Sequence, residues 1–205
     1  MIDTPDVIVD EDSHGYVQDG YACHRSVTGL LKKYGLGMDF SKIPAFVLER
    51  ARQRGKAVAV GCKLIAEGRQ LGPVDVRIEP YLHAFSDFWH QSGAELIETE
   101  IPRISPLGFG FTPDLVCWLN GERTIIDGKA TFKVPKSVGP QTAGYQVGWN
   151  SLFTGSPVQS RAALWLKKDG KYQLKALEDP DDTTAFLDCL EADIKLTRWE
   201  AKYHE

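Results

Sequence analysis

Apolar residues recur along this chain with two different spacings, and the spacing predicts which segments form helices and which form strands. An amphipathic helix is expected where apolar residues recur every three or four positions. The helices predicted in this way cover residues 26–34, 56–66, 80–91, 140–153 and 183–203. Pro44 is suited to the first turn of one more helix, which leads into Arg54 and Gly55.

Strands are expected where apolar and polar residues alternate, or where short apolar runs are bounded by turn residues. A β-hairpin is predicted over residues 7–22, and single strands over residues 95–101, 161–167 and 171–176. Along residues 95–101, the alternation assigns Ile97, Thr99 and Ile101 to one face and Glu98 and Glu100 to the other. Helices first, strands in the middle and helices again predict an α/β or α+β core, with a central mixed β-sheet flanked by helices on both faces.

The strongest local signal is the Asn120-Gly121 pair between two apolar runs, which is typical of a β-hairpin with a two-residue type I′ turn. If Leu119 faces Glu122 across this turn, the pairing register of the two strands is determined. Residues 113–129 therefore form the centre of the predicted sheet.

This register places Asp114 directly opposite Asp127 on one face of the hairpin, with Cβ atoms roughly 5 Å apart. Two carboxylates at that distance are unfavourable unless one is protonated or a cation lies between them. Lys129, two residues after Asp127 and on the same face, supplies one positive charge. A divalent metal could supply the rest.

The length of 205 residues suits one domain over residues 1–205, with an N-terminal hairpin and a helical extension. Its 42% apolar and 25% charged residues are typical of a soluble globular protein. No apolar run approaches 18 residues, and the first residues lack the features of a signal peptide. A cytoplasmic location without membrane association is therefore expected.

Positive charge is local, because the whole chain carries a net charge of −4. A dedicated nucleic-acid-binding protein usually shows a basic excess, but a nuclease needs only a basic groove. Two clusters could supply one: Arg50, Arg52, Arg54 and Lys56 in the first, and Lys129, Lys133 and Lys136 in the second. A solvated helix end is an equally good interpretation of the first cluster.

The four cysteines are far apart in the sequence and form no C-x-x-C pair, so they indicate neither a zinc site nor a disulfide framework. Reduced, mostly buried thiols are expected.

The helix predicted after the hairpin carries Gln141 and Tyr145, which are four residues apart and therefore on one face. Such a pair can donate hydrogen bonds to phosphate oxygens or bases, although an interfacial Tyr beside a solvated Gln would show the same spacing. Gly144 and Gly148 repeat this spacing on a neighbouring strip and would let the helix approach another element closely.

Three motifs together resemble the signature of a known nuclease superfamily. Pro113-Asp114, Asp127-Gly128-Lys129 and Gln141-x-x-x-Tyr145 are similar to the PD-(D/E)XK motif with the Q-x-x-x-Y extension of the RecB-like and phage exonuclease branch. The hairpin context and the order of the motifs make the match more specific than the loose P-D…D-x-K pattern alone. The resemblance extends over about residues 8 to 190 through Arg25-Ser26-Val27-Thr28, Arg54-Gly55-Lys56-Ala57-Val58 and Lys168-Asp169-Gly170-Lys171-Tyr172.

The resemblance implies a restriction-endonuclease-like core and a metal-dependent DNA exonuclease of phage-type recombination, replication or repair. Its metal ligands for Mg²⁺ or Mn²⁺ would be Asp114, Asp127, the carbonyl of Gly128 and, as an additional acid, Glu100. Lys129 would position the attacking water or stabilise the transition state.

The implied partner is DNA, as linear ends or single strands. Gln141 and Tyr145 would orient the DNA end, and Arg54, Lys133 and Lys136 would contact phosphates. A phage recombinase or a single-strand-binding protein is a candidate protein partner, in the host cytoplasm if the chain is phage-encoded.

The chain departs from the family pattern at two positions. Ala59 stands where the branch has a metal-binding His, and Ala130 stands where a Thr commonly follows the Lys. Relatives with an iron–sulfur cluster use a cysteine spacing that this chain lacks, so no such cluster is expected. Two alternatives therefore stay open: a catalytically impaired member that binds DNA or a protein, and a structure-selective endonuclease.

Overall fold

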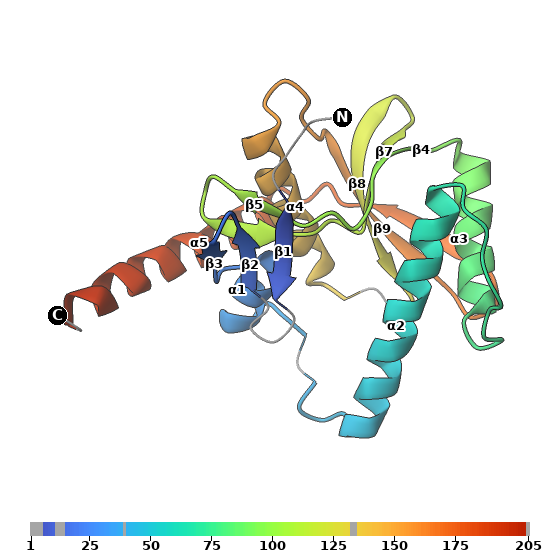
Figure 1. The fold of residues 1–205 in the computed structure, drawn as a ribbon, viewed down its shortest axis with the longest axis horizontal. Coiled ribbons are helices and arrows are strands. Elements are labelled where there is room, and N and C mark those ends of the chain that lie inside the picture. The colour runs from blue at the N-terminus through green and yellow to red at the C-terminus, as the bar shows by residue number, and fades with distance from the viewer. Residues whose placement is uncertain (1–5, 11–14, 39, 132–134, 204–205) are drawn as a thin grey trace.

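The computed structural model describes residues 6–10, 15–38, 40–131 and 135–203 (Figure 1). Within these ranges, the helices are α1 (Val27–Lys33), α2 (Ala45–Ala66), α3 (Glu79–Ser92), α4 (Val138–Leu152) and α5 (Asp181–Glu200), followed by a 3₁₀ turn (Ala201–Tyr203). The first strands are β1 (Val7–Asp10), β2 (Gly15–Gln18), β3 (Tyr21–Cys23), β4 (Glu95–Glu98), β5 (Arg103–Ser105) and β6 (Phe109–Phe111). The remaining strands are β7 (Leu115–Leu119), β8 (Glu122–Lys129), β9 (Ser160–Leu166) and β10 (Tyr172–Ala176).

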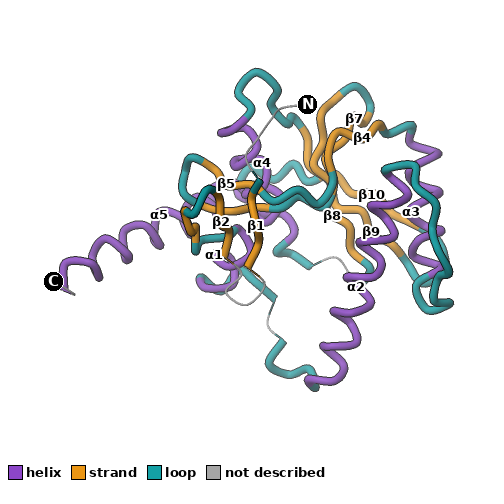
Figure 2. Tube along the Cα trace, in the orientation of Figure 1, coloured by secondary structure: helices purple, strands orange, loops and turns teal. Residues whose placement is uncertain are grey.

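The central sheet has five strands in the order β10-β9-β8-β7-β4 (Figure 2). Strands β8 and β9 are parallel and joined through α4, whereas the other neighbours are antiparallel. The predicted mixed sheet is therefore confirmed. A β1-β2-β3 sheet and a β5-β6 pair lie beside it.

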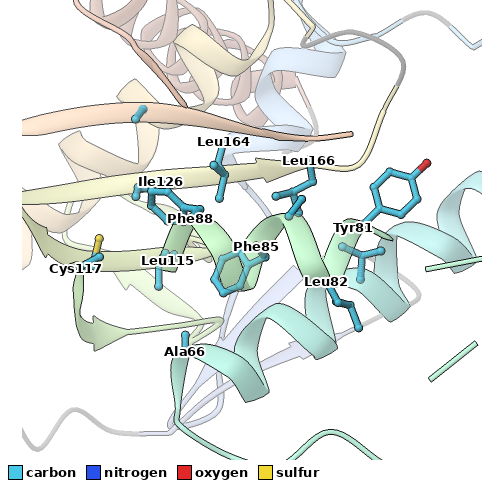
Figure 3. Packing of buried hydrophobic residues seen from close by; sticks show 14 of the residues in the cluster. Ala66, Tyr81, Leu82, Phe85, Phe88, Leu115, Cys117, Ile126, Leu164 and Leu166 are labelled. Carbon is cyan, nitrogen blue, oxygen red and sulfur yellow. The ribbon is translucent and has the colours of Figure 1, made fainter. Parts of the chain in front are cut away.

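Two apolar clusters cover the two faces of this sheet, because alternate residues of each strand point to opposite sides. Leu115, Ile126 and Leu164 face α2 and α3, where Leu82, Phe85 and Phe88 pack against them (Figure 3). Val116 and Ile125 face the other way, toward α1, α4 and α5. The predicted α+β architecture, with helices on both faces, is thus confirmed, and it is consistent with a restriction-endonuclease-like core.

The predicted break between two helices at Gly55 is wrong, because α2 runs without interruption from Ala45 to Ala66. A glycine inside a helix costs about 1 kcal/mol relative to alanine but does not end the helix. Gly68, with a φ of 67°, follows the real end of the helix.

The predicted strand over residues 95–101 is too long, because β4 ends at Glu98. A β-bulge shifts the register between Leu96, which pairs with Cys117, and Glu98, which pairs with Val116. Ile97 packs in the cluster beside α4, and Glu98 forms an ion pair with Arg103, which lies over the rings of Trp149 and Phe153. The bulge therefore changes which residues share a face, and the simple alternation does not hold.

Helix α4 begins at Val138, two residues before the predicted start. The close approach predicted for its glycines is confirmed. A Cβ at Gly144 would lie 2.8 Å from side-chain atoms of Phe186 and Val27, and one at Gly148 would lie 2.6 Å from Phe111. Their small size lets α4 lie close to its neighbours.

The predicted mostly buried thiols are confirmed, since Cys23, Cys117 and Cys189 are buried and Cys62 is partly buried. None of the helices in the described ranges is both long and apolar enough to cross a lipid bilayer.

Asp193 on α5 joins that helix to α1, and replacing it with Asn is expected to lower the free energy of unfolding by about 2 kcal/mol. The buried carboxylate lies 2.7 Å from both Arg25 Nε and Lys33 Nζ. Burial opposes ionisation, but hydrogen bonds from Lys33 and Arg25 outweigh it and lower the pKa of Asp193. Urea denaturation at pH 7 measures the loss.

The lowered pKa means that this stabilisation is present above the unfolded-state pKa of about 4 and disappears as the pH falls through the folded-state value. The difference between the wild-type protein and Asp193→Asn should therefore close in acid. Asp188→Asn, at an exposed position of α5, is the matched control and should change stability by less than about 0.5 kcal/mol. Equal unfolding midpoints for the two variants would contradict this prediction.

Candidate active site

The hairpin of β7 and β8 has the predicted register. Its ladder runs from Leu119 opposite Glu122 to Leu115 opposite Ile126. Asn120 and Gly121 both have positive φ, of 53° and 83°, as a type I′ turn requires.

Asp114 is the first residue beyond this ladder and caps its end. Its Oδ2 accepts a hydrogen bond of 2.9 Å from the backbone N–H of Gly128, in the place of a backbone carbonyl. The carboxylate is therefore held where the two strands separate, next to the segment that carries Asp127 and Lys129.

Asp127 is fully buried, with 0% of its surface exposed. Its Oδ2 lies 2.7 Å from Lys129 Nζ, yet neither carboxylate oxygen has a well-oriented hydrogen-bond donor among the residues that the structure describes. Burial alone would lower the pKa of Lys129, but the charges of Asp127 and Asp114 outweigh it and raise that pKa. A buried carboxylate with unsatisfied oxygens calls for a further positive partner.

The pKa of the neighbouring Asp114 carboxyl is also shifted. Burial and, second, the charge of Asp127 raise the pKa of Asp114 to about 8. Without an added cation, Asp114 is therefore protonated at neutral pH, so the two acids are not both charged. This is the behaviour expected of facing carboxylates that lack a metal.

Helix α2 forms one wall of a small cavity of about 80 Å³, which Asp114 lines and Asp127 does not. The helix turns Ala59, Cys62 and Lys63 toward it, and Asp114, Glu100 and Gly128 line the other side. The cavity is otherwise mostly apolar. Ala59 therefore faces this cavity, but it brings no ligand atom.

Glu100 is held beside the Pro-Asp motif by the backbone. Its N–H donates to the carbonyl of Pro113 at 3.1 Å, and the Thr99 hydroxyl donates to the carbonyl of Asp114 at 2.7 Å. Its φ of 53° is in the left-handed region, which is unfavourable for a residue with a side chain and is common at functional sites. Burial raises the pKa of Glu100, whereas the nearby Lys63 lowers it.

Gln141 and Tyr145 lie on the face of α4 that approaches the acids. The Gln141 amide donates to the Tyr145 hydroxyl at 2.8 Å, so the phenol hydrogen remains for another acceptor. Burial first, and then the charges of Asp114 and Asp127, raise the pKa of Tyr145 well above its ordinary value. The Q-x-x-x-Y spacing thus identified a buried Tyr145 and a partly exposed Gln141 that lie near the two carboxylates.

Of the three residues predicted to contact phosphates, Arg54 and Lys136 do not line this cavity. Arg54 lies on a neighbouring strip of α2, with its guanidinium 5.9 Å from the centre of the Tyr81 ring. Lys136 is exposed in the turn before α4. Lys133 lies outside the described residues.

Three residues near the site were not predicted from the sequence. Lys63 and Cys62 follow Ala59 by four and three positions, and helical spacing could have found them once Ala59 was known to face the site. Tyr16, on β2, donates to or accepts from the Thr112 hydroxyl at 3.0 Å. The long separation of Tyr16 and Thr112 in sequence leaves no local signal.

The donor set fits Mg²⁺ better than a softer metal. Asp114, Asp127 and the Gly128 carbonyl supply oxygens, and Mg²⁺ is commonly held by one or two carboxylates while it keeps several waters. Among the described residues, no group of three or more Asp, Glu, His or Cys side chains converges as a complete metal cage. Glu100 therefore lies near the pair without completing a cluster with it.

Comparison with known proteins gave matches to solved structures alone. Neither the protein-family models nor the curated proteins include a match to this chain. One similar structure is an alkaline exonuclease from Laribacter hongkongensis, at 19% identity and a TM-score of 0.38 over 76% of this chain and 88% of that one. Another is SSO0001, at 17% identity and a TM-score of 0.37 over 57% of each chain.

Proposed function

We propose that this protein is a PD-(D/E)XK-type nuclease that hydrolyses DNA phosphodiester bonds with Mg²⁺ or Mn²⁺, acting from DNA ends. The observation that carries the proposal is the buried Asp127, whose oxygens have no well-oriented hydrogen-bond donor among the described residues, beside Asp114 with a raised pKa. Lys129 lies on the same strand, in the position that the D-x-K motif requires. Once Asp114 loses its proton, the two carboxylates outweigh Lys129 and leave a negative charge that a divalent cation would neutralise.

Each residue of the site has a separate proposed role. Asp114, Asp127 and the Gly128 carbonyl would hold the cation, which would supply Lewis-acid polarisation of the scissile phosphate and of a bound water. Lys129, kept charged by its acidic neighbours, orients the attacking water or stabilises the negative charge of the transition state. Glu100 would add negative charge at the rim of the site when ionised.

The α4 pair positions the substrate. Tyr145, with its hydroxyl oriented by Gln141, donates a hydrogen bond to a phosphate near the cleaved bond. Exonuclease action in phage-type recombination, replication or repair rests on the sequence resemblance, as does a recombinase or single-strand-binding protein as a partner.

A digestion time course tests this function. The protein is incubated with end-labelled linear DNA or covalently closed circular DNA, with Mg²⁺, with Mn²⁺ or with EDTA. Metal-dependent loss of linear DNA alone is expected. Equal cleavage of closed circles would replace the exonuclease mode with a structure-selective endonuclease, and cleavage in EDTA would contradict the metal-dependent site.

A catalytically impaired DNA-binding protein is the second candidate function. Ala59 contributes no ligand, and no three-side-chain metal cluster is present in the described part of the chain. Calorimetry that shows DNA binding without Mg²⁺ or Mn²⁺ binding would favour this candidate over an active nuclease.

Substituting Ala59 with His is expected to raise the affinity for Mn²⁺ by about tenfold. Ala59 faces the cavity that Asp114 and Glu100 line, so an imidazole there would add one ligand to a set that has too few. Isothermal titration calorimetry measures the change.

The matched control is Ala59→Leu, which fills the same space without a ligand atom and should not raise the affinity. An equal gain in both variants would show that cavity filling, and not ligation, is responsible.

A further inference from the structure

A second cleft, separate from the carboxylates, lies between α2, the segment that leads into α3, and the turn between β9 and β10. It is open and has a volume of about 660 Å³. Four cations line it, Arg50, Arg54, Arg77 and Lys168, against one acid, Asp75. The cleft is thus strongly positive in a chain whose net charge is −4.

The single acid of this cleft is already neutralised. Asp75 accepts hydrogen bonds from the Arg77 guanidinium, with both oxygens 3.0 Å from Nε, and these bonds lower the pKa of Asp75 to about 2. Among the described residues, Arg50, Arg54 and Lys168 have no carboxylate within ion-pair distance. The cleft therefore keeps an excess of uncompensated positive charge.

The Arg54 side chain indicates which kind of ligand the cleft suits. Its guanidinium packs over the ring of Tyr81, and its Nε is buried without an acceptor in the part of the chain that the structure describes. A buried N–H group normally has an acceptor. A planar guanidinium held in one orientation suits a phosphate, which can accept two parallel hydrogen bonds.

The cleft and the active-site cavity share helix α2. Arg50, Arg54 and Ala57 face the cleft, whereas Gly55 and Ala59 face the cavity. Arg54 and Ala59 are five residues apart, or roughly 7.5 Å along the helix axis.

We propose that this basic cleft is a second phosphate-binding site, which holds backbone phosphates of the DNA strand at a distance from the cleaved bond. The identity of the occupant rests on the proposed nuclease function, whereas the phosphate chemistry rests on the cleft itself. Free nucleotides carry the same phosphate groups. The test therefore separates a strand from a free nucleotide.

The test measures binding of the full-length protein to a fluorescein-labelled oligothymidine of about 20 nucleotides by anisotropy, in EDTA so that no cleavage occurs. Arg50→Gln/Arg54→Gln is compared with Arg52→Gln/Lys56→Gln, which removes equal charge from exposed positions of the same helix that do not line the cleft. The cleft variant should bind about tenfold more weakly. Its plot of log affinity against log salt concentration should be shallower by about 1.4, for two lost phosphate contacts.

The control variant should bind within about twofold of the wild-type protein. Equal losses in the two double variants would overturn the proposal, because the cleft would then act only through general charge. Lys168→Gln against Lys171→Gln repeats the comparison on an exposed turn, where neither change threatens the fold. For Lys168→Gln, the slope of log affinity against log salt concentration should become shallower by about 0.7. If Lys168→Gln and Lys171→Gln give the same slope, the proposal is overturned.

Calorimetry with ATP in EDTA separates the two sources of phosphate. ATP binding that the Arg50→Gln/Arg54→Gln change abolishes, with oligothymidine binding unchanged, would assign the cleft to a free nucleotide and overturn the proposal. The inference and the nuclease function also fail differently. If the wild-type protein cleaves DNA and the cleft variants bind DNA like the controls, only the proposed phosphate site in the cleft is rejected. If the cleft variants lose DNA binding but the wild-type protein cleaves no DNA, only the proposed nuclease activity is rejected.

Discussion

Replacing Asp127 with Asn is expected to lower the rate of DNA cleavage by about a thousandfold while the fold is retained. Asn has nearly the same shape as Asp, so the packing of this fully buried side chain changes little. The amide, however, lacks the negative charge that would hold the cation and that keeps Lys129 in place at 2.7 Å. Single-turnover cleavage of end-labelled linear DNA with Mg²⁺ measures the loss, and circular dichroism checks the fold.

Glu122→Gln is the matched control for this change. Glu122 is an exposed acid at the other end of the same strand β8, and its conversion to an amide should alter cleavage by less than about twofold. Lys129→Ala belongs in the same assay and should also lose most activity. Undiminished cleavage by either Asp127→Asn or Lys129→Ala would remove this assignment of the site.

The affinity for Mg²⁺ is expected to fall about tenfold for each pH unit below 8, or about a hundredfold between pH 8 and pH 6. The reason is the pKa of Asp114, which burial and the charge of Asp127 raise to about 8 in the metal-free protein. A metal that binds the carboxylate must displace its proton, so binding weakens as protonation becomes more complete. Calorimetric titrations at several pH values, with proton release obtained from buffers of different ionisation enthalpy, measure both effects.

The stability of the metal-free protein should follow the same titration. A carboxyl whose folded-state pKa lies above its unfolded value of 3.8 contributes most stability below pH 4, and this stability is lost as the pH rises toward about 8. Burial also raises the pKa of Glu100, which acts in the same direction. The melting temperature in EDTA should therefore fall as the pH rises over this range.

Asp114→Asn cannot titrate at this position, so its melting temperature in EDTA should vary less with pH than that of the wild-type protein. Added Mg²⁺ should stabilise the wild-type protein most at alkaline pH and should stabilise Asp114→Asn much less. A Mg²⁺ affinity that is constant between pH 6 and pH 8 would contradict the assignment of Asp114 as a ligand.

Local patterns were sufficient where one short segment contains all the information. The Asn120-Gly121 turn sets the hairpin register, because a two-residue turn allows only one pairing of its flanking strands. The spacing of Gln141 and Tyr145 placed them on one helix face, where they are hydrogen-bonded. The predicted helix boundary at Gly55 was wrong, because this glycine lowers helix stability locally while the packing of α2 on the sheet maintains the helix.

Long-range geometry was not accessible to these patterns. The bulge at β4 lies where Glu98 forms its ion pair with Arg103. The strands β5 and β6 were not predicted because each has only three residues. The basic residues of α2 form one cluster in the sequence. In the structure, Arg50 and Arg54 line a cleft, while Arg52 and Lys56 do not.

The sequence by itself determined the mixed α+β architecture, the hairpin register and the set of acids at its open end, because turn chemistry and side-chain periodicity act over a few residues. Only the tertiary structure decided that Asp127 is fully buried, with no well-oriented donor to its oxygens in the described ranges. It likewise decided that Ala59 and Lys63 face Asp114 and Glu100 across a cavity. Burial and the raised pKa of Asp114 arise from atoms that distant segments bring together. No local pattern encodes that desolvation, since it depends on how α2 and α4 pack against the sheet.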